Sequence, residues 1–465
     1  MYDLIVIGSG PAGYVGAIHA AQSGLKVALI EKDTALGGTC LNRGCIPTKA
    51  LLFSALQFDK SKKWAEYGLK VSSPAELDYA QVLKRKDGVV KKMNSGVSFL
   101  MKKNKVDVFQ GTGKLKSTTE VEVTSAQGKK EVLSTQFILL AMGSRVRSLP
   151  FAPVDGQFIY SSDEILFTTE VPKTMGIIGG GVIGCEFASC FGRFGSQVTL
   201  LEGSDQLIPT EDHETAEELA KGLKKQNVSI HLGVKVIKVE VLKDKKLVAV
   251  YVDGQKDPYT FEKLLVSVGR APVTEEVGLS TVGVKTDERG FIPVDLKSYQ
   301  TNIPNIYAAG DIIPTPQLAH TGSAEAIFAV DHIVKKPRHP INYLTNPAAI
   351  YTYPEVASIG YTEKALKAQN REYKSSKFPF SAIAKAQIED CPDGFIKILA
   401  DKKYGEILGV HIVHAKATEL IAEFSLGNNL EMTLDELSTT IHPHPTLTET
   451  ILEAAHGAMG HAIHI

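Results

Sequence analysis

The sequence has little cysteine, almost no net charge and no long apolar run. Five cysteines are spread over 465 residues, and this odd, thin distribution argues against a disulfide framework. The 51 basic and 52 acidic residues leave a net charge of −1, which gives no indication of a nucleic-acid partner. No apolar run approaches the ~18 residues of a membrane-spanning helix. We therefore expect a protein that works without nucleic acid and without a membrane.

The composition that remains is typical of a soluble α/β enzyme. Hydrophobic residues make up 43% of the chain, and there are 40 glycines. The length suggests two to four domains. The first predicted strand begins at Tyr2 or Asp3, which leaves no room for a signal or transit peptide. Together with the scarcity of cysteine, this predicts a cytoplasmic protein, or a mitochondrial matrix protein if the chain is a processed form.

One supersecondary unit occurs twice in the chain. The first copy has an apolar strand over residues 3–7, a helix of small residues and a second strand over 26–30. Its fingerprint residues are Gly8, Gly10, Gly13 and Glu31. The second copy has strands over 174–178 and 197–201. Its fingerprint residues are Gly179, Gly181, Gly184 and Glu202. In both copies the acid lies 18 residues beyond the third glycine.

Each residue type in this fingerprint has a physical role in binding a dinucleotide. The first glycine permits a tight turn, the second lets the backbone approach a pyrophosphate, the third lets helix pack on strand, and the acid accepts hydrogen bonds from ribose hydroxyls. A single G-x-G-x-x-G could be a mere glycine-rich turn, but two copies in the same structural context argue against that. We predict one tightly held redox dinucleotide and one exchangeable one. No arginine closely follows Glu202, which favours NAD over NADP.

Cys40 and Cys45 lie in G-G-T-C-L-N-R-G-C-I-P-T-K, after the first fingerprint and before a helix predicted over 46–64. This helix, with Pro47 near its first turn, would direct its amide groups and positive dipole end at Cys45. The pKa of the Cys45 thiol should then fall. A disulfide that closes so small a ring would add only about 2 kcal/mol, which a chain of this length hardly needs. The position predicts a reactive pair rather than a structural one.

A second cysteine pair with the same spacing serves as an internal control. Cys185 and Cys190 lie within the regular helix predicted after the second fingerprint. Residues five apart in an ideal α-helix have Cα atoms about 8.6 Å apart, beyond the roughly 7 Å that a disulfide tolerates. We therefore predict two ordinary buried cysteines there. Between Cys40 and Cys45, Gly44 allows the irregular turn that a bridge requires.

Other strands end in turns that suit a cofactor. Strands predicted over 137–140 and 264–268 run into turns that contain Ser144 and Gly269. A further strand ends in A-A-G-D at Asp311, where the carboxylate could hydrogen-bond the sugar chain of a cofactor. Taken alone, Asp311 could equally be a helix cap or a turn residue.

Near the C-terminus, His442 and His444 lie between prolines in I-H-P-H-P-T-L-T-E-T. A histidine five residues before Glu449 can act as a general base, held in one tautomer and made more basic by the carboxylate. Alternatively, Thr446 and Glu449 form the T-x-x-E of a capping box for a helix predicted over 447–459. The reactive cysteine pair needs a base, which favours the catalytic interpretation.

The remaining histidines at this end do not indicate a metal. They show no closed set of ligand spacings with cysteine or aspartate, so we predict no metal site; they are His456, His461 and His464.

These motifs together resemble the pyridine nucleotide-disulfide oxidoreductases, most closely the branch that oxidises dihydrolipoamide with NAD⁺. The resemblance rests on the Cys40 and Cys45 motif, the paired fingerprints, A-A-G-D and H-P-T-L-T-E, and it runs along essentially the whole chain. It implies an α/β fold with two Rossmann-like domains, for FAD and NAD, and an α+β C-terminal dimerisation domain. The expected division is an FAD domain over 1–147, an NAD domain over 148–274, a second part of the FAD domain over 275–345, and an interface domain over 346–465.

The resemblance also implies roles for individual residues. The expected FAD contacts are Gly8, Gly10, Gly13, Glu31, Lys49, Gly113, Ser144, Asp311 and Ala319. The expected NAD contacts are Gly179, Gly181, Gly184, Glu202, Val236 and Gly269. Lys49 would pair with Glu186 beside the flavin, although alone it could be a solvent-facing lysine.

The catalytic roles follow from the same resemblance. Cys45 would contact the flavin and Cys40 would exchange with substrate. His444, oriented by Glu449, would act as the base on the cysteines of the other subunit, so a homodimer is required for activity.

The implied activity is the oxidation of protein-bound dihydrolipoamide to lipoamide, through a Cys40–Cys45 disulfide and FAD, with reduction of NAD⁺ to NADH. The implied partners are lipoyl domains of 2-oxo acid dehydrogenase complexes or the glycine-cleavage lipoyl protein.

Three alternatives remain. A glutathione-reductase-like enzyme would have arginines after Glu202, and a mercuric-reductase-like enzyme would have C-terminal cysteines, whereas Cys391 is the last cysteine here. A non-catalytic FAD-binding protein would be expected to lack the reactive cysteines or the His444 and Glu449 pair. Departures from the commoner family pattern, such as Pro443 between the histidines, remove no chemical group.

Overall fold

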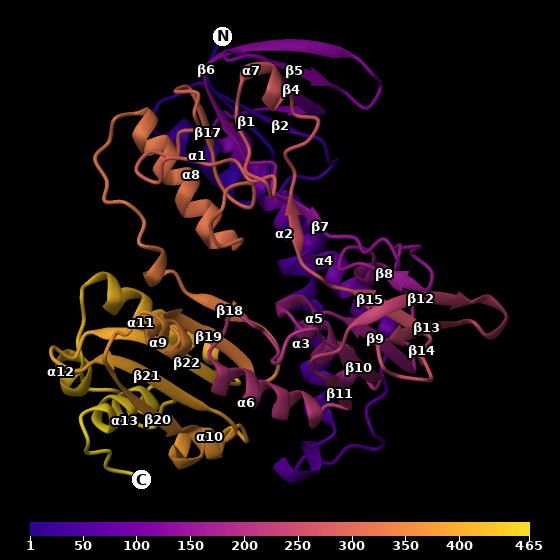
Figure 1. Ribbon diagram of the computed structural model, residues 1–465, viewed down its shortest axis with the longest axis vertical. Coiled ribbons are helices and arrows are strands. Elements are labelled where there is room, and N and C mark those ends of the chain that lie inside the picture. Colours follow the sequence, from indigo (N-terminus) through magenta and orange to yellow (C-terminus); the bar gives the residue numbers. More distant parts are fainter.

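A computed structural model describes residues 1–465, which form three packed units (Figure 1). The first unit combines two separate parts of the sequence, because the strand at 306–308 joins the sheet of the N-terminal strands. Between these two parts the chain forms a second unit. The C-terminal residues, drawn in orange to yellow, form a third.

The first unit is a seven-stranded sheet of order β3-β2-β1-β6-β5-β4, in which β17 pairs with β6. The pairs around β1 and the pair of β17 with β6 are parallel, whereas β4 and β5 continue the sheet in antiparallel fashion. The strands are β1 (Tyr2–Ile7), β2 (Val27–Glu31), β3 (Asp107–Gln110), β4 (Thr112–Ser117), β5 (Glu120–Thr124), β6 (Lys130–Leu140) and β17 (Ile306–Ala308). The helices of these parts of the chain are α1 (Pro11–Gln22), α2 (Gly38–Arg43), α3 (Cys45–Ser61), α4 (Tyr79–Lys103), α7 (Leu279–Val282) and α8 (Ala319–Ile333).

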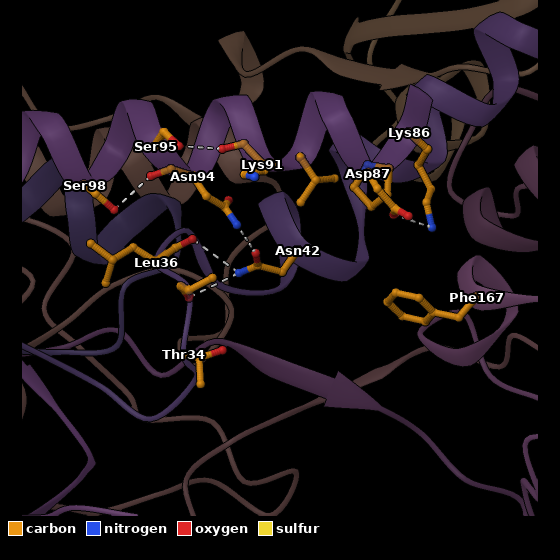
Figure 2. A pocket seen from close by; sticks show the side chains of 13 residues that line it. Thr34, Leu36, Asn42, Lys86, Asp87, Lys91, Asn94, Ser95, Ser98 and Phe167 are labelled. Atoms are coloured by element: carbon orange, nitrogen blue, oxygen red, sulfur yellow. Dashed lines mark hydrogen bonds and ion pairs between the residues drawn. The ribbon is translucent and has the colours of Figure 1, made fainter. Parts of the chain in front are cut away.

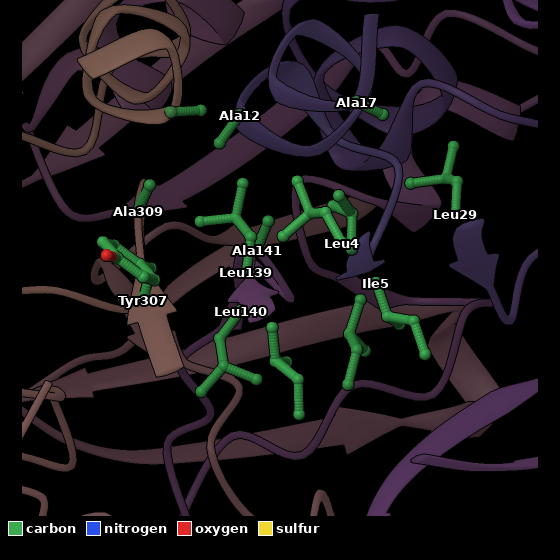
Figure 3. Close-up of a cluster of buried hydrophobic side chains, with 14 of the residues drawn as sticks. Leu4, Ile5, Ala12, Ala17, Leu29, Leu139, Leu140, Ala141, Tyr307 and Ala309 are labelled. Atoms are coloured by element: carbon green, nitrogen blue, oxygen red, sulfur yellow. The ribbon is translucent and has the colours of Figure 1, made fainter. Parts of the chain in front are cut away.

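The core of the first unit explains why its parallel strands are continuous apolar runs. Leu4, Leu29 and Leu139 are fully buried in the centre of the sheet (Figure 3), as expected for parallel strands that are covered on both faces. The outer strands β4 and β5 alternate between buried and exposed residues instead. On one face α1 packs closely against α8, since a Cβ at Gly16 would lie 3.1 Å from that of Ala326.

The second unit repeats this plan with a parallel sheet of order β11-β10-β9-β15-β8 and a separate antiparallel sheet, β12-β13-β14. Its strands are β8 (Ile159–Tyr160), β9 (Thr174–Ile178), β10 (Gln197–Leu201), β11 (Val228–His231), β12 (Val236–Leu242), β13 (Leu247–Val252), β14 (Tyr259–Phe261) and β15 (Lys263–Val266). Its helices are α5 (Val182–Phe194) and α6 (His213–Lys224). Where the chain passes between the first two units, β7 (Ser144–Val146) and β16 (Arg270–Pro272) form a short antiparallel ribbon.

The third unit is an antiparallel sheet of order β18-β19-β22-β21-β20. Its strands are β18 (Ala348–Ile350), β19 (Glu355–Gly360), β20 (Tyr373–Pro379), β21 (Phe395–Asp401) and β22 (Ile407–His414). Its helices are α9 (Glu363–Ala368), α10 (Ala384–Ile388), α11 (Ala417–Asn429), α12 (Leu434–Thr439) and α13 (Glu449–Ala458). One face of the sheet shares a core with α11 and α13, and α6 of the second unit packs against β19 and β22.

The structure confirms the predicted α/β class, both supersecondary repeats and the buried, helical Cys185 and Cys190. The end of the helix predicted over 46–64 was wrong, because α3 ends at Ser61 and a separate 3-10 turn covers Trp64–Tyr67. Residues 62–72 are exposed, so a further helical turn would gain no packing energy. The C-terminal helix begins at Glu449 rather than at Leu447.

No helix of the structure combines the length and the apolar character that crossing a bilayer requires.

Candidate active site

Cys40 and Cys45 are held by a break between two helices. Cys40 belongs to α2, Cys45 is the first residue of α3, and Gly44 separates them. A Cβ at Gly44 would lie 2.9 Å from the carbonyl oxygen of Thr39, so only glycine allows this close approach. Both cysteines are partly buried free thiols, which is the dithiol state of the predicted redox pair. The disulfide itself stays a prediction.

The two thiols differ strongly in acidity. A hydrogen bond from Cys40 lowers the pKa of Cys45 to about 7, against the opposing effect of burial, and the charge of Lys49 adds to this lowering. The same contact, together with burial, raises the pKa of Cys40 well above its usual range. The sequence predicted a lowered pKa at Cys45 from the helix dipole, whereas the leading cause is the neighbouring thiol. The arrangement therefore supports a thiolate at Cys45 with Cys40 as its protonated partner.

Lys49 is paired with a carboxylate from the second unit. Its Nζ lies 2.8 Å from both carboxylate oxygens of Glu186. Burial opposes the charge of Lys49, but Glu186 and Cys45 together hold the pKa of the lysine above its usual value. Glu186 also accepts a hydrogen bond from the Tyr351 amide at 3.0 Å, and Lys49 lies 4.7 Å from the centre of the Tyr351 ring. This one carboxylate thus joins all three units beside the cysteines.

A Lys49→Met variant should raise the pKa of Cys45, because it removes a positive charge that stabilises the thiolate. With a pKa of about 7, the Cys45 thiol is mainly ionised at pH values above about 7. In Lys49→Met, the pH at which the reduced protein becomes reactive should therefore rise by about one unit. The rate of alkylation by iodoacetamide, measured as a function of pH, reports this midpoint. Lys62→Met, at the exposed residue directly after the same helix, is the matched control and should leave the midpoint in place. An unchanged midpoint in Lys49→Met contradicts the electrostatic role.

The glycines of the two fingerprints adopt the same local geometry. Gly8 and Gly179 have positive φ angles of 99° and 104°, which side chains rarely adopt. A Cβ at Gly13 would lie 1.8 Å from the carbonyl oxygen of Gly8, and the equivalent distance from Gly184 to Gly179 is 1.9 Å. In contrast, a Cβ at the middle glycines would have no neighbour within 4 Å; these are Gly10 and Gly181. Each turn is thus tightly packed at its third glycine and open at its middle glycine, at the start of a helix. This arrangement fits a dinucleotide pyrophosphate.

The two acids also make the same contacts. Glu31 accepts hydrogen bonds from the amides of Ser9 and Asp33, both at 2.8 Å. Glu202 accepts from the amides of Gly180 and Ser204, the latter at 2.7 Å. Each carboxylate ties the glycine turn to the end of the next strand. Carboxylate oxygens accept more than one hydrogen bond each, so both acids can also bind ribose hydroxyls. The residues present fit FAD and NAD.

Asp311 lies in a network that joins distant segments, not at a helix cap. Its carboxylate accepts a hydrogen bond from the Ser144 hydroxyl, which in turn accepts from Arg270 Nε at 2.7 Å. The adjacent Gly310 amide donates to Glu325 at 2.8 Å. Glu325 is fully buried, and burial raises its pKa to about 6.

The other expected cofactor residues lie at strand and helix ends or in a sheet. Ala319 is the first residue of α8, and Val236 is the first residue of β12. Gly269 has a φ of 102°, with no atom within 4 Å of a Cβ placed there. Gly113 lies within β4, where a Cβ would lie 3.2 Å from Ile7.

His444 and Glu449 form a hydrogen-bonded pair at the start of α13. His444 Nδ1 lies 2.8 Å from Glu449 Oε1, and the Thr446 amide donates to Glu449 Oε2 at 2.9 Å. The same carboxylate therefore orients the histidine and accepts one of the two hydrogen bonds of the alternative capping box. Thr446 does not complete a capping box, since its hydroxyl donates to the Pro443 carbonyl. The side chain of His444 is 73% exposed.

The structure does not bring His444 to the cysteines of its own chain. Its side chain hydrogen-bonds only to Glu449, and Figure 1 draws α13 in the third unit, away from α2. The neighbouring His442 differs, because its side chain is 4% exposed and pairs with Glu423 at 3.0 Å. Of the two histidines, His444 is the one available to another chain.

A cleft of about 640 Å³ lies between α2 and α4 (Figure 2). Its lining includes Asn42, Asn94 and Phe167, and it contains none of the predicted site residues. Asn42 is two positions beyond Cys40 on the same short helix, so its side chain points to the opposite face of α2. The Cys40 thiol thus lies on the other side of α2 from the cleft.

Three residues near the site were not predicted from the sequence. Burial and the proximity of Cys40 raise the pKa of Tyr14, so this tyrosine lies close to the Cys40 thiol. Tyr351 contacts Lys49, and Glu325 holds the turn before Asp311. A signal existed only for Tyr14, which directly follows the third fingerprint glycine.

Two family models match the chain. The model described as pyridine nucleotide-disulphide oxidoreductase matches residues 2–326, and the model of the dimerisation domain of the same group matches residues 346–455.

Similar proteins match along the full length. The chain is 42% identical over 466 residues to dihydrolipoyl dehydrogenase 2, mitochondrial, of Arabidopsis thaliana, which covers 100% of this chain and 91% of that protein. It is also 42% identical over 474 residues to dihydrolipoyl dehydrogenase of Bacillus subtilis, covering 100% and 99%. Among solved structures, LpdA from Mycobacterium tuberculosis superposes with a TM-score of 0.92 at 26% identity, over 98% of this chain and 100% of the other. The HOCl-induced flavoprotein disulfide reductase RclA from Escherichia coli gives 0.86 at 26% identity, over 98% and 99%.

Proposed function

Because the chain belongs to the pyridine nucleotide-disulphide oxidoreductase family, we propose that it oxidises protein-bound dihydrolipoamide to lipoamide and reduces NAD⁺ to NADH. The observation that carries this proposal is the Cys40 and Cys45 dithiol with its lowered pKa at Cys45, in a chain whose full-length relatives are named dihydrolipoyl dehydrogenases. The enzymes of this family use FAD and NAD. FAD, when bound, accepts two electrons from the dithiol and passes them to NAD⁺ as hydride.

The two nucleotides occupy the two fingerprints in this proposal. The first fingerprint holds the adenosine and pyrophosphate of FAD through Gly8, Gly10, Gly13 and Glu31. Distant segments complete the FAD site with Lys49, Gly113, Ser144, Asp311 and Ala319. NAD is held by the second fingerprint and its neighbours, Gly179, Gly181, Gly184, Glu202, Val236 and Gly269. The four segments 1–147, 148–274, 275–345 and 346–465 are assigned as FAD, NAD, FAD and interface domains.

The chemistry begins at the disulfide state of the cysteine pair. The partner's His444, oriented by Glu449, takes a proton from one thiol of dihydrolipoamide, and the resulting thiolate attacks Cys40 Sγ. The Cys40–Cys45 bond breaks and Cys45 leaves as a thiolate, which the positive charge of Lys49 favours. The second substrate thiol then displaces Cys40, so lipoamide is released and the dithiol remains. Lys49 stabilises the Cys45 thiolate electrostatically.

The proposal includes a homodimer and a macromolecular substrate. The dimerisation domain supports a homodimer, and the exposed His444 is consistent with a base that serves the other subunit. The lipoyl domains of 2-oxo acid dehydrogenase complexes, or the glycine-cleavage lipoyl protein, would present dihydrolipoamide. We place the protein in a reducing compartment, the cytoplasm or the mitochondrial matrix, because five thinly spread cysteines argue against a disulfide framework.

The purified protein should be yellow and should reduce NAD⁺ with dihydrolipoamide far better than it oxidises NADPH with glutathione disulfide. Glu202 would repel the 2′-phosphate of NADP, and no arginine follows it, so we expect a preference for NAD⁺ over NADP⁺ of about 100-fold in kcat/KM. Steady-state rates with both nucleotides and both disulfide couples measure this directly. A faster reaction with NADPH and glutathione disulfide contradicts the proposed function.

A further inference from the structure

A row of polar side chains crosses the sheet of the third unit on the face toward α6. Ser358, His411, Lys397 and Lys377 are cross-strand partners on β19, β22, β21 and β20. The neighbours of Lys397 along β21 are isoleucines that join the apolar core on the other face. The Lys397 side chain has no exposed surface. A lysine buried this completely requires ionic partners.

The partners of Lys397 come mainly from the second unit. Its Nζ lies 2.8 Å from Asp212 Oδ1 and 2.7 Å from Glu214 Oε2, and 3.1 Å from Glu363 Oε2 of α9. Burial alone would lower the pKa of Lys397, but the hydrogen bonds to Asp212 and Glu214 raise it above its usual range. Lys397 is therefore a cation that ties the start of α6 to the dimerisation domain.

The segment tied in this way forms one side of the second fingerprint. Residues 203–212 run from the end of β10 to α6, and Asp212 is their last residue. The Ile208 amide donates to the carbonyl oxygen of Gly180 at 2.8 Å, while the Gly180 amide donates to Glu202. Movement of this segment therefore changes the position of both the glycine turn and the acid that would bind ribose.

The segment also stores backbone strain. Ile208 has a φ of 40°, a left-handed conformation that is unfavourable for a β-branched residue. Such a conformation persists only where the surrounding contacts fix it. At the first end of the segment, Glu202 accepts hydrogen bonds from the Gly180 and Ser204 amides. At the other end, Asp212 accepts hydrogen bonds from Lys397 and from the Glu363 amide, the latter at 3.1 Å.

We propose that Lys397 is a positioning residue for the second dinucleotide site: by holding Asp212, it fixes residues 203–212 and with them Gly180 and Glu202. The dimerisation domain thereby contributes to nucleotide affinity without touching the nucleotide. This inference rests on the proposed function in one respect, that the second fingerprint binds NAD.

The test is Lys397→Met in the FAD-loaded dimer, which keeps an unbranched side chain only one atom shorter and removes its charge. The Kd for ADP-ribose, which carries the ribose that Glu202 would bind but no nicotinamide, is measured by calorimetry. We expect this Kd and the KM for NAD⁺ to rise roughly tenfold. The rate of flavin reduction by dihydrolipoamide in the absence of NAD⁺ should stay unchanged, because the cysteine site does not depend on this segment.

Lys377→Met is the matched control. Lys377 belongs to the same polar row but pairs with Glu214 and does not contact Asp212, so neither nucleotide constant should change. A folded Lys397→Met protein with unchanged ADP-ribose affinity overturns the inference, as does a parallel loss of flavin reduction. If Lys397→Met does not fold, Asp212→Asn is judged by the same measurements, and failure of both to fold assigns Lys397 a purely structural role. Failure of the proposed function is seen separately, as wild-type protein that does not reduce NAD⁺ with dihydrolipoamide.

Discussion

A Cys45→Ser variant is expected to lose NAD⁺ reduction by dihydrolipoamide by a factor of about 10³ or more, while it still binds FAD. Serine cannot form the disulfide that the substrate thiolate attacks, and its hydroxyl does not ionise near neutral pH as the Cys45 thiol does. The fingerprint contacts around Gly8 and Glu31 do not involve Cys45, so the cofactor site should persist. Steady-state rates give the loss of activity, and the visible spectrum gives the FAD content per subunit.

Cys190→Ala is the matched control for this variant. Cys190 has the same spacing from Cys185 as Cys45 has from Cys40, but it is completely buried in α5, and burial raises its pKa far above the range in which a thiol reacts. The turnover of the Cys190→Ala variant should equal that of the wild-type protein. Undiminished turnover in Cys45→Ser would return Cys40 and Cys45 to a structural role.

The parts of the fold that the sequence predicted are those determined by local interactions. The three glycines and the acid of each fingerprint have fixed spacings because a tight turn, a helix start and a strand end follow one another within a few residues. The two copies consequently fold alike, down to the same pair of amides on Glu31 and on Glu202. Strand positions were also predictable, since buried parallel strands are continuous apolar runs.

The features that escaped prediction depend on partners far away in the chain. Asp212 and Lys397 are separated by 185 residues, and nothing in the sequence around a lysine on a β-strand indicates which carboxylates will surround it. The same holds for Glu325, which holds the turn at Gly310. The early end of α3 at Ser61 has a related cause, because helix length depends on whether the next turn finds a surface to pack against.

A His444→Gln variant is expected to slow NAD⁺ reduction by dihydrolipoamide by about 10² to 10⁴. Glutamine can keep a hydrogen bond to Glu449 but cannot take a proton from a thiol. The loss should be confined to the step in which dihydrolipoamide reduces the flavin, whereas flavin reduction by NADH in the reverse direction should be unaffected. Stopped-flow measurements of the two half-reactions separate these steps. Equal losses in both would contradict a role for His444 as the base.

The origin of that base can be tested in mixed dimers. A dimer of one Cys45→Ser subunit and one His444→Gln subunit, purified by two different tags, joins two inactive chains. If His444 acts on the other subunit, one of the two sites combines an intact cysteine pair with an intact His444, and about half of the wild-type turnover per dimer should return. If His444 acts within its own chain, each site keeps one defect and no activity returns. The exposed His444 side chain, which hydrogen-bonds only to Glu449 in its own chain, leads us to expect recovery.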